Sequence, residues 1–321
     1  AFHHFVPIDR PDAVRRFLDH WRPELAVWVE SELWPNLVRA THLRQIPTVL
    51  LQGRMSAKSH RNWRWARSLI KPLLAGFSQV LVQTQADASR FRDLGAIQPV
   101  VTGTLKYAGF PLVAEEAALR EMRGLLGGRK RWLAASIHPG EFETVYQTHV
   151  QLRESFPDLL TIVVPRHPSG AFELEKKWLS RGLSCARRSV GVGPSSEMEV
   201  YIADTMGELG LFYRVSPLAL IGGSFIDHGG QNPIEAVQLG CAVITGPSMF
   251  NFAEVVADFS VNGVSLSIGT PADLRGKLAE MLSATEHTFS LAQQQKKIVA
   301  AKAGVIDTVF EALMSCLPTS E

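Results

Sequence analysis

A glycine-rich segment, Gly222 to Glu235, has the residue types that bind the phosphate of a nucleotide. It follows an apolar run that predicts a strand, and it leads into a predicted helix with Pro233 near its first turn. Glycines let backbone N–H groups approach a phosphate closely, and a helix N-terminus adds partial positive charge. Glu235 lies one turn into that helix, where its carboxylate can accept hydrogen bonds from ribose hydroxyls. The spacing matches neither Gly-x-Gly-x-x-Gly nor the Walker sequence, which disfavours dinucleotides and triphosphates. A tight turn with a helix cap completed by Glu235 is the structural alternative.

Two further loops follow predicted strands and can reach the same ligand. Pro165 to Pro168 ends one strand, and the Arg166 guanidinium can bind a phosphate through two parallel N–H donors. Asp204 to Leu209 ends the next strand, where Gly207 permits close backbone approach to a base or ribose. Each loop by itself is more often structural than functional. Because the carboxyl ends of parallel strands meet at one edge of an open α/β sheet, the three loops together predict a ligand site there.

Three more polar residues lie at predicted strand ends. Ser136 and His138 follow the first strand of the second half, and His138 can act as an acid or base because its ordinary pKa is near neutrality. A structural loop histidine is nevertheless the more common outcome. In the first half, Glu32 is a candidate to face a cleft, with a helix cap by Ser31 or Glu32 as the alternative. No Asp-x-Asp pair, metal-spaced histidine cluster or nucleophile elbow is present, so we expect neither a bound metal nor a serine hydrolase.

One segment of the first half is strongly basic. Between Leu33 and Ala86 the sequence holds eight Lys or Arg residues and no Asp or Glu, although the whole chain has a net charge of +2. Trp63 and Trp65 interrupt the most basic part. One interpretation is a solvated cationic helix whose tryptophans pack inward. The other is a site for an anionic surface, where each Lys or Arg near acidic lipid contributes about 1 kcal/mol and Trp favours the interface. Nucleic acid would also suit such a patch.

The arrangement of apolar runs predicts how these residues are positioned. Short apolar or β-branched runs alternate with amphipathic stretches, which is typical of parallel-sheet α/β domains. At roughly 100–200 residues per domain, 321 residues predict two domains. We place the boundary near residue 110, giving domains 1–110 and 111–321, and expect the stretch from Glu286 to Cys316 to be helical throughout. Predicted strands are Leu25 to Val29, Thr48 to Gln52, Val80 to Gln83, Val100 to Thr102, Trp132 to Ala135, Leu160 to Val164, Val200 to Ile202, Leu218 to Ile221, Val243 to Thr245 and Val264 to Ile268.

The composition is that of an ordinary globular protein. The residues are 46% hydrophobic and 20% charged, and the near-neutral total argues against a wholly basic nucleic-acid coat. Cys185, Cys241 and Cys316 lie far apart, which gives neither a metal-spaced cluster nor an even disulfide framework and favours a reducing compartment. No apolar run approaches the roughly 18–20 residues of a membrane span, so we expect any membrane contact of these residues to be peripheral.

Seven segments together resemble motifs of the bacterial 3-deoxy-D-manno-octulosonic acid (Kdo) transferases of lipid A assembly. The resemblance implies two Rossmann-like α/β domains facing a cleft, the GT-B glycosyltransferase architecture. It implies transfer of Kdo from CMP-Kdo to a lipid A precursor, lipid IVA, with inversion at the anomeric carbon and without an essential metal or cofactor. It also implies an anionic membrane partner at the cytoplasmic face of the inner membrane and no nucleic-acid partner. The segments are Glu30 to Asn36, Gln52 to Ser56, Thr102 to Lys106, Pro165 to Pro168, Asp204 to Leu209, Gly222 to Glu235 and Gly246 to Phe252.

The same resemblance suggests roles for individual residues. Arg166 and the Gly223-Ser224 loop would stabilise the departing phosphate, Glu235 would hold the ribose, and Ser136 with His138 would form a possible donor or phosphate loop. The donor-binding set is Pro165, Arg166, Met206, Gly207, Glu208, Gly223, Ser224, Asn232, Pro233, Ile234 and Glu235. The acceptor and membrane surface is Arg54, Lys58, Arg61, Arg64, Arg67 and Lys71.

The sequence departs from the family pattern at several points. The family usually has His, Pro and Asn where Gln231, Ala236 and Thr104 stand. Its general base is a glutamate in a Gly/Ser-rich loop near the N-terminus, and no position of this chain matches that motif. We therefore assign no catalytic base and keep Glu32 as a cleft candidate only. We expect an N-terminally truncated chain with an incomplete first domain, which binds CMP-Kdo and transfers poorly because losing a base typically costs about 10²–10⁴-fold.

Two alternatives stay open at this point. Sugar-nucleotide 2-epimerases share the two-domain fold and a strand-end glutamate on the ribose, so the chain can instead be an epimerase. A catalytically impaired, peripheral membrane nucleotide-binding protein built around the basic segment is the second alternative. Transfer of labelled Kdo, epimerisation of a UDP-sugar, or neither reaction distinguishes the three hypotheses.

Overall fold

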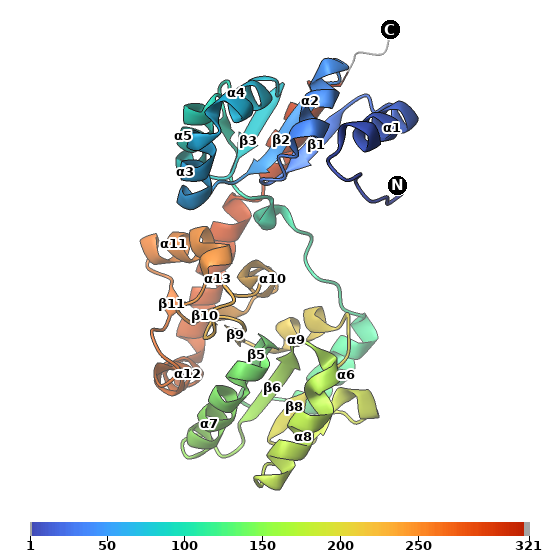
Figure 1. Ribbon diagram of the computed structural model, residues 1–321. Helices are drawn as coiled ribbons and strands as arrows, with labels where there is room; N and C mark the ends of the chain where they lie inside the picture. Colours follow the sequence, from blue (N-terminus) through green and yellow to red (C-terminus); the bar gives the residue numbers. More distant parts are fainter. Residues whose placement is uncertain (1, 318–321) are drawn as a thin grey trace. The chain divides into compact units, whose positions relative to one another are not determined.

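A computed structural model describes residues 2–317, and these residues divide into two compact α/β units (Figure 1). Unit 1 contains residues 2–108 and 302–317, and unit 2 contains residues 109–301. The predicted division gave every residue from 111 onward to the second domain, whereas helix α14 (Val305–Met314) lies in unit 1. An amphipathic helix at the end of a chain does not reveal, from its own periodicity, which of two sheets it covers.

Unit 1 is built on a parallel sheet of four strands in the order β1-β2-β3-β4. Successive residues of β2 point to opposite faces, so Val49 packs with α14 while Leu50 packs in the larger core on the other face. Both faces are therefore covered, which explains why the strands are nearly continuous apolar runs. The strands are β1 (Ala26–Val29), β2 (Thr48–Gly53), β3 (Gln79–Val82) and β4 (Val100–Val101). The other helices are α1 (Pro11–Trp21), α2 (Pro35–Leu43), α3 (Ala57–Trp65), α4 (Arg67–Ala75), α5 (Gln85–Leu94) and the 3₁₀ turn η1 (Leu105–Ala108).

Unit 2 is built on a parallel sheet of seven strands in the order β11-β10-β9-β5-β6-β8-β7. The chain begins in the middle at β5, extends the sheet on one side through β6, and later returns to the other side of β5 with β9. The order thus reverses between β5 and β9, which is the switch point where open α/β sheets bind ligands. The strands are β5 (Arg131–Ile137), β6 (Leu160–Pro165), β7 (Cys185–Arg187), β8 (Val200–Ile202), β9 (Leu218–Ile221), β10 (Ala242–Thr245) and β11 (Leu266–Ser267).

Eight α-helices of unit 2 connect and cover these strands (Figure 1). Helices α7 and α12 pack together, and α13 packs on α10 and β10. None of the helices in the described part of the chain is long and apolar enough to cross a membrane. They are α6 (Glu116–Leu126), α7 (Phe142–Arg153), α8 (Ala171–Ser180), α9 (Leu209–Val215), α10 (Pro233–Gln238), α11 (Ala253–Val261), α12 (Asp273–Ser283) and α13 (Thr285–Ala301).

The ten predicted strands are confirmed, with ends shifted by a few residues, and two features differ from prediction. Strand β7 was not predicted because its three half-buried residues include an arginine and show no apolar run. The expectation of an unbroken helix from Glu286 to Cys316 is wrong, since α13 ends at Ala301 and α14 begins at Val305. Gly304 occupies the N-cap position of α14, and the turn before it carries the chain from unit 2 back to unit 1.

Candidate functional site

The loops singled out from the sequence follow β5, β6, β8 and β9, so the structure brings them to the carboxyl edge of one sheet. Two of these loops flank the switch point between β5 and β9. Gly222 lies so close to the end of β5 that a Cβ added to it would be 2.1 Å from the Ser136 carbonyl oxygen. Ser136 itself has a φ of +56° at an irregularity in the β5–β6 register. The absence of a side chain at Gly222 therefore allows the loops after β5 and β9 to approach each other closely.

The buried carboxylate of Glu141 holds the β9 loop against the β5 loop. It accepts hydrogen bonds from the backbone N–H groups of Gly223 (2.7 Å), Ser224 (3.1 Å) and Phe225 (3.0 Å). It also accepts one from the N–H of His138 (3.1 Å), and its own exposure is 0%. The donors that the sequence analysis assigned to a phosphate are thus bonded to a carboxylate of the protein. No local sequence pattern predicts this role for Glu141, because its partners in the β9 loop lie more than eighty positions further along the chain.

Ser224 is part of the same internal packing. Its exposure is 0%, its hydroxyl donates to the Ile221 carbonyl, and it accepts from the N–H of Gly246 (2.9 Å). In the structure the backbone N–H groups of Gly223 and Ser224 and the Ser224 hydroxyl have partners within the protein, which hold the loop. Their role toward a donor phosphate stays a prediction.

The start of α10 presents Glu235 from a capped helix. The Asn232 side chain accepts from the Ile234 N–H (3.1 Å) and donates to Glu235 Oε1 (3.1 Å), with Pro233 at the first turn. Burial raises the pKa of the Glu235 carboxyl above its ordinary value, and the hydrogen bond from Asn232 opposes that shift. Pro233 and Ile234 are buried and set the position of the helix. Glu235 is half-buried, which leaves it the polar group of this segment that a ligand can reach.

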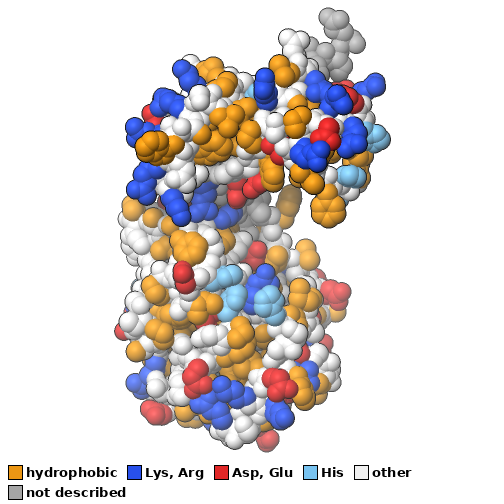
Figure 2. Space-filling model, in the orientation of Figure 1, with side chains coloured by type: hydrophobic (Ala, Val, Ile, Leu, Met, Phe, Trp, Pro, Cys, Tyr) orange, Lys and Arg blue, Asp and Glu red, His pale blue; other side chains and the backbone are white. Residues whose placement is uncertain are grey.

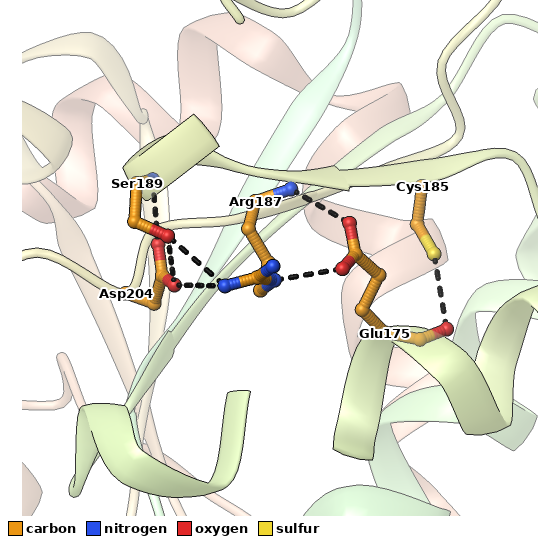
Figure 3. Close-up of polar contacts among 5 residues, drawn as sticks. All are labelled: Glu175, Cys185, Arg187, Ser189 and Asp204. Carbon is orange, nitrogen blue, oxygen red and sulfur yellow. Dashed lines mark hydrogen bonds and ion pairs between the residues drawn. The ribbon is translucent and has the colours of Figure 1, made fainter. Parts of the chain in front are cut away.

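The loop after β8 is anchored by Asp204, as Figure 3 shows. Asp204 accepts from Ser189 N–H (2.9 Å) and Ser189 Oγ (2.6 Å), and it pairs with Arg187 Nη1 at 3.4 Å. Arg187 donates its Nε to Glu175 of α8 at 2.7 Å. This network joins β7, β8 and α8, and so fixes the base of the loop that carries Met206.

The tip of the loop after β8 carries one exposed side chain, Met206, and one ion-paired side chain, Glu208. Met206 is 78% exposed and Gly207 has a φ of +84°, which only glycine adopts readily. Glu208, in contrast, is held by Arg188 through two N–H donors at 2.7 and 2.5 Å. The Arg188 guanidinium holds the pKa of the Glu208 carboxyl below its ordinary value. No local pattern predicts this pair, because the two residues are twenty positions apart in the chain.

Arg166 follows β6 and has no side-chain partner. Its side chain is exposed, and within the described residues its guanidinium makes no hydrogen bond or ion pair. The preceding Pro165 is buried at the end of the strand. His138 and His167 lie 6.3 Å apart between ring centroids, and Arg166 acts electrostatically on His138. Figure 2 shows histidine side chains gathered beside a Lys or Arg side chain on the surface of unit 2.

In unit 1 the strand-end residues serve mainly to tie loops together. Glu32 is exposed and accepts a hydrogen bond from the Trp34 indole (3.1 Å), while the Ser31 hydroxyl donates to the Arg54 carbonyl. The Gln52 side chain links β2 to the segment after β4 through Gly103 O (2.9 Å) and the Leu105 N–H (2.9 Å). The Glu32 carboxylate is thus accessible, and it has no further partner among the described residues.

The basic segment forms an exposed surface on α3 and α4, which we call the α3–α4 surface. Arg67 and His60 pair with Asp93 of α5 at 3.4 and 2.9 Å, so the fold supplies one carboxylate that the local sequence lacks. Trp65 is 93% exposed, whereas Trp63 packs on the core of unit 1. The inward-packing interpretation therefore holds for Trp63 and is wrong for Trp65. The cations of this surface that are exposed and form no ion pair with the described residues are Arg54, Lys58, Arg61, Arg64 and Lys71.

Comparison with known proteins gives the family. A family model described as 3-deoxy-D-manno-octulosonic-acid transferase (kdotransferase) matches residues 1–109. A probable mitochondrial 3-deoxy-D-manno-octulosonic acid transferase of Arabidopsis thaliana is 36% identical over 100% of this chain and 72% of its own length. The 3-deoxy-D-manno-octulosonic acid transferase of Haemophilus influenzae is 31% identical over 98% of this chain and 74% of its own length. The chain belongs to the Kdo transferase family.

Solved structures agree with this assignment. The C-terminal CMP-Kdo binding domain of WaaA from Acinetobacter baumannii has a TM-score of 0.54 and 29% identity, covering 58% of this Kdo transferase and 99% of that domain. The UDP-GlcNAc 2-epimerase of Neisseria meningitidis has a TM-score of 0.60 over 95% of this chain, at 12% identity, which shows the fold alone. The predicted fold class, with Rossmann-like α/β domains of the GT-B glycosyltransferase type, is confirmed. As a member of this family the chain is a glycosyltransferase.

Proposed function

We propose that this Kdo transferase binds CMP-Kdo at the carboxyl edge of the unit 2 sheet and transfers Kdo, with inversion, to a lipid A precursor such as lipid IVA. The observation that carries the proposal is the exposed guanidinium of Arg166, which follows β6, the strand next to the switch point of the sheet. This guanidinium has no partner among the described residues. It lies on a unit that is 29% identical to a domain named for binding CMP-Kdo. An unpaired guanidinium at that edge is suited to an anionic phosphate.

Other groups at this edge would each bind a different part of the donor. Glu235 supplies an accessible carboxylate that can accept from ribose hydroxyls, because Asn232 and Pro233 fix it at the first turn of α10. Gly207 and the exposed Met206 line the nucleotide side of the site, on a loop that Asp204 anchors. Glu208 is paired with Arg188, so its contribution is to set the shape of this loop. Ser136 and His138 lie at the switch point and belong to the loop that faces the donor.

The acceptor side belongs to unit 1 in this proposal. The α3–α4 surface combines unpaired Lys and Arg side chains with the exposed Trp65 and Leu69, over the part of unit 1 that carries many blue and orange side chains in Figure 2. Such a surface suits a phosphorylated lipid at an anionic membrane, since cations attract the headgroups and Trp packs at the interface. The protein would then act as a peripheral protein on the cytoplasmic face of the inner membrane, in lipopolysaccharide biosynthesis.

Binding of CMP tests the donor site. Arg166→Ala and Glu235→Ala should each weaken CMP affinity by about 10- to 100-fold, the effect of one hydrogen bond to a charged group. Isothermal titration calorimetry measures both. Arg120→Ala and Glu121→Ala are matched controls, because both residues are exposed on α6 of the same unit, and they should leave CMP affinity unchanged. Unaltered CMP affinity in both site variants would refute the site.

Product analysis tests the reaction. Incubation with CMP-Kdo that carries a label in the sugar and with lipid IVA should yield labelled lipid, detected by thin-layer chromatography, and the configuration of the new linkage reports inversion. The epimerase hypothesis predicts instead that a UDP-sugar is converted to its 2-epimer and that CMP does not compete. Epimerisation without CMP affinity would overturn the proposed function.

A further inference from the structure

Four side chains at the carboxyl edge of unit 2 can hold positive charge without a carboxylate bound to them. They are Arg166, His138, His167 and His228, and the described part of the chain forms no ion pair with any of them. The rings of His138 and His228 lie 4.4 Å apart, and those of His138 and His167 lie 6.3 Å apart. We call these four residues the edge cluster. They come from three different loops, after β5, β6 and β9, so the fold and not local sequence brings them together.

Other cations and donors nearby are already engaged. Arg187 and Arg188, beside β7 at the end of the sheet, are bound to Glu175, Asp204 and Glu208. The backbone N–H groups of Gly223, Ser224 and Phe225 in the β9 loop are bound to Glu141. Asp227, next to His228, is an exposed carboxylate of the same loop. The edge cluster therefore supplies the groups that can neutralise a negative charge brought to the switch point by a ligand.

Gln231 links two members of the edge cluster. Its side-chain Nε2 lies 3.1 Å from His138 Nε2 and 3.0 Å from His228 Nε2. An amide nitrogen can only donate, so in this orientation both imidazole nitrogens accept and both rings are neutral. A half-turn of the amide places its oxygen there, and that oxygen can accept from an Nε2–H on either ring. Gln231 can thus satisfy the pair both before and after the pair gains a proton.

The surroundings of His138 favour the neutral form of its imidazole. Burial lowers the pKa of the His138 imidazole, and His228, Arg166 and His167 lower it further, whereas Glu141 raises it. An anion held between the rings would favour the protonated imidazole, because a nearby negative charge raises the pKa of a histidine. The cluster is therefore suited to accept negative charge and a proton together.

We propose that the edge cluster binds both negative groups at the anomeric carbon of a sugar-acid nucleotide, the phosphate on Arg166 and the carboxylate on His138 and His228. The proposal rests on the proposed function, which supplies the donor. Kdo is a 2-keto sugar acid, so in CMP-Kdo one carbon carries both the carboxylate and the phosphate oxygen. Two anions on one carbon favour several groups that can hold positive charge close together, and the edge cluster has three imidazoles with rings 4.4 and 6.3 Å apart, with Arg166 acting electrostatically on His138. Nucleotides of neutral sugars lack the carboxylate and lose that contact.

The test compares two phosphodiesters that differ in the carboxylate. CMP-Kdo carries it, and CMP methyl ester does not. His138→Asn and His228→Asn should each weaken CMP-Kdo binding by about tenfold, as expected for a lost charged hydrogen bond, and leave CMP methyl ester within about twofold. Calorimetry in two buffers of different ionisation enthalpy should show proton uptake with CMP-Kdo for the unaltered protein only. His287→Asn, an exposed histidine on α13, is the matched control and should change neither ligand.

The outcomes separate this inference from the proposed function. If the unaltered protein binds neither ligand, the donor assignment itself fails. If it binds both and the histidine variants weaken both equally, or neither, the donor site stands and the carboxylate subsite is refuted. His228 is exposed, so its replacement does not threaten folding and keeps the test decisive if His138→Asn proves unstable.

Discussion

Neighbouring parts of one sheet edge in unit 2 use arginine in opposite ways. Near β7 and β8, Arg187 and Arg188 each meet a carboxylate within 2.7 Å, and the resulting pairs fix the backbone of two loops. After β6, Arg166 is exposed and has no carboxylate among the described residues. The difference is made by the neighbouring elements, since Glu175 comes from α8 and Glu208 from the loop after β8. A paired arginine stabilises the fold, and an unpaired one keeps its charge for a ligand.

The α3–α4 surface of unit 1 extends the comparison. Arg67 resembles the structural arginines of unit 2 because Asp93 neutralises it, whereas Arg61 and Arg64 resemble Arg166. Pairing is therefore the feature that separates supporting cations from candidate binding cations in both units. Three experiments test whether pairing distinguishes these roles, and they are given in order of decreasing expected effect.

The largest effect is expected for Asp204→Ala. Removing this 8% exposed carboxylate leaves the N–H and the hydroxyl of Ser189 without their acceptor, while Arg187 keeps its pair with Glu175. Each hydrogen bond to a charged group contributes about 1.5–3 kcal/mol. Urea unfolding should show a clearly lowered midpoint, and CMP affinity should fall because the loop bearing Met206 loses its anchor. Arg166→Ala is the contrasting variant and should leave the unfolding midpoint unchanged. An Asp204→Ala protein as stable as the parent would contradict the structural role.

The next largest effect is a loss of stability at low pH, caused by a buried histidine without a carboxylate partner among the described residues. His149 lies in the core with Nδ1 2.8 Å from Thr161 Oγ1, and burial lowers its pKa to about 4. The unfolded chain binds the proton near pH 6.5, so stability contributed by neutral His149 is present above that pH and is lost as the pH falls toward about 4. The loss should amount to about 2–3 kcal/mol.

Unfolding curves at several pH values measure this loss. His149→Gln keeps a hydrogen-bonding group without the titration and should flatten the dependence between pH 4 and 6.5. His287→Gln, on the exposed face of α13, should leave the slope as it is. A parent protein with no slope in this interval would contradict the burial argument.

The smallest effect is expected at the membrane. Reversing Arg61 and Arg64 to Glu should weaken partition onto anionic phospholipid vesicles by roughly 10- to 100-fold, since each cation near the surface contributes about 1 kcal/mol. CMP affinity should not change, because these residues lie in unit 1. Arg120 and Arg123 have the same i,i+3 spacing on an exposed helix of unit 2, and their reversal is the matched control. Equal loss of vesicle binding in both double variants would show that net charge, not the α3–α4 surface, governs binding.

Much of the candidate site could be predicted from the sequence because it lies where apolar runs end. The ends of β6, β8 and β9 were each predicted to within a few residues, so Arg166, Gly207 and Glu235 could be placed at one edge before the fold was known. What could not be predicted was which of those groups are already occupied. Glu141 and Arg188 decide that for the glycine loop and for Glu208, and both act across distances in sequence that no local pattern reports.

Hydrophobic periodicity and strand-end motifs are local properties of the chain, so the family resemblance, the two parallel α/β sheets and the edge at which polar residues gather could be predicted from the sequence. The folded structure was needed to show that α14 packs with unit 1, that Trp65 is exposed while Trp63 is partly buried against the core, and that His167 and His228 lie beside His138. These three outcomes have one cause. Burial and charge neutralisation depend on which distant segments meet, and that is fixed by the packing of the whole sheet.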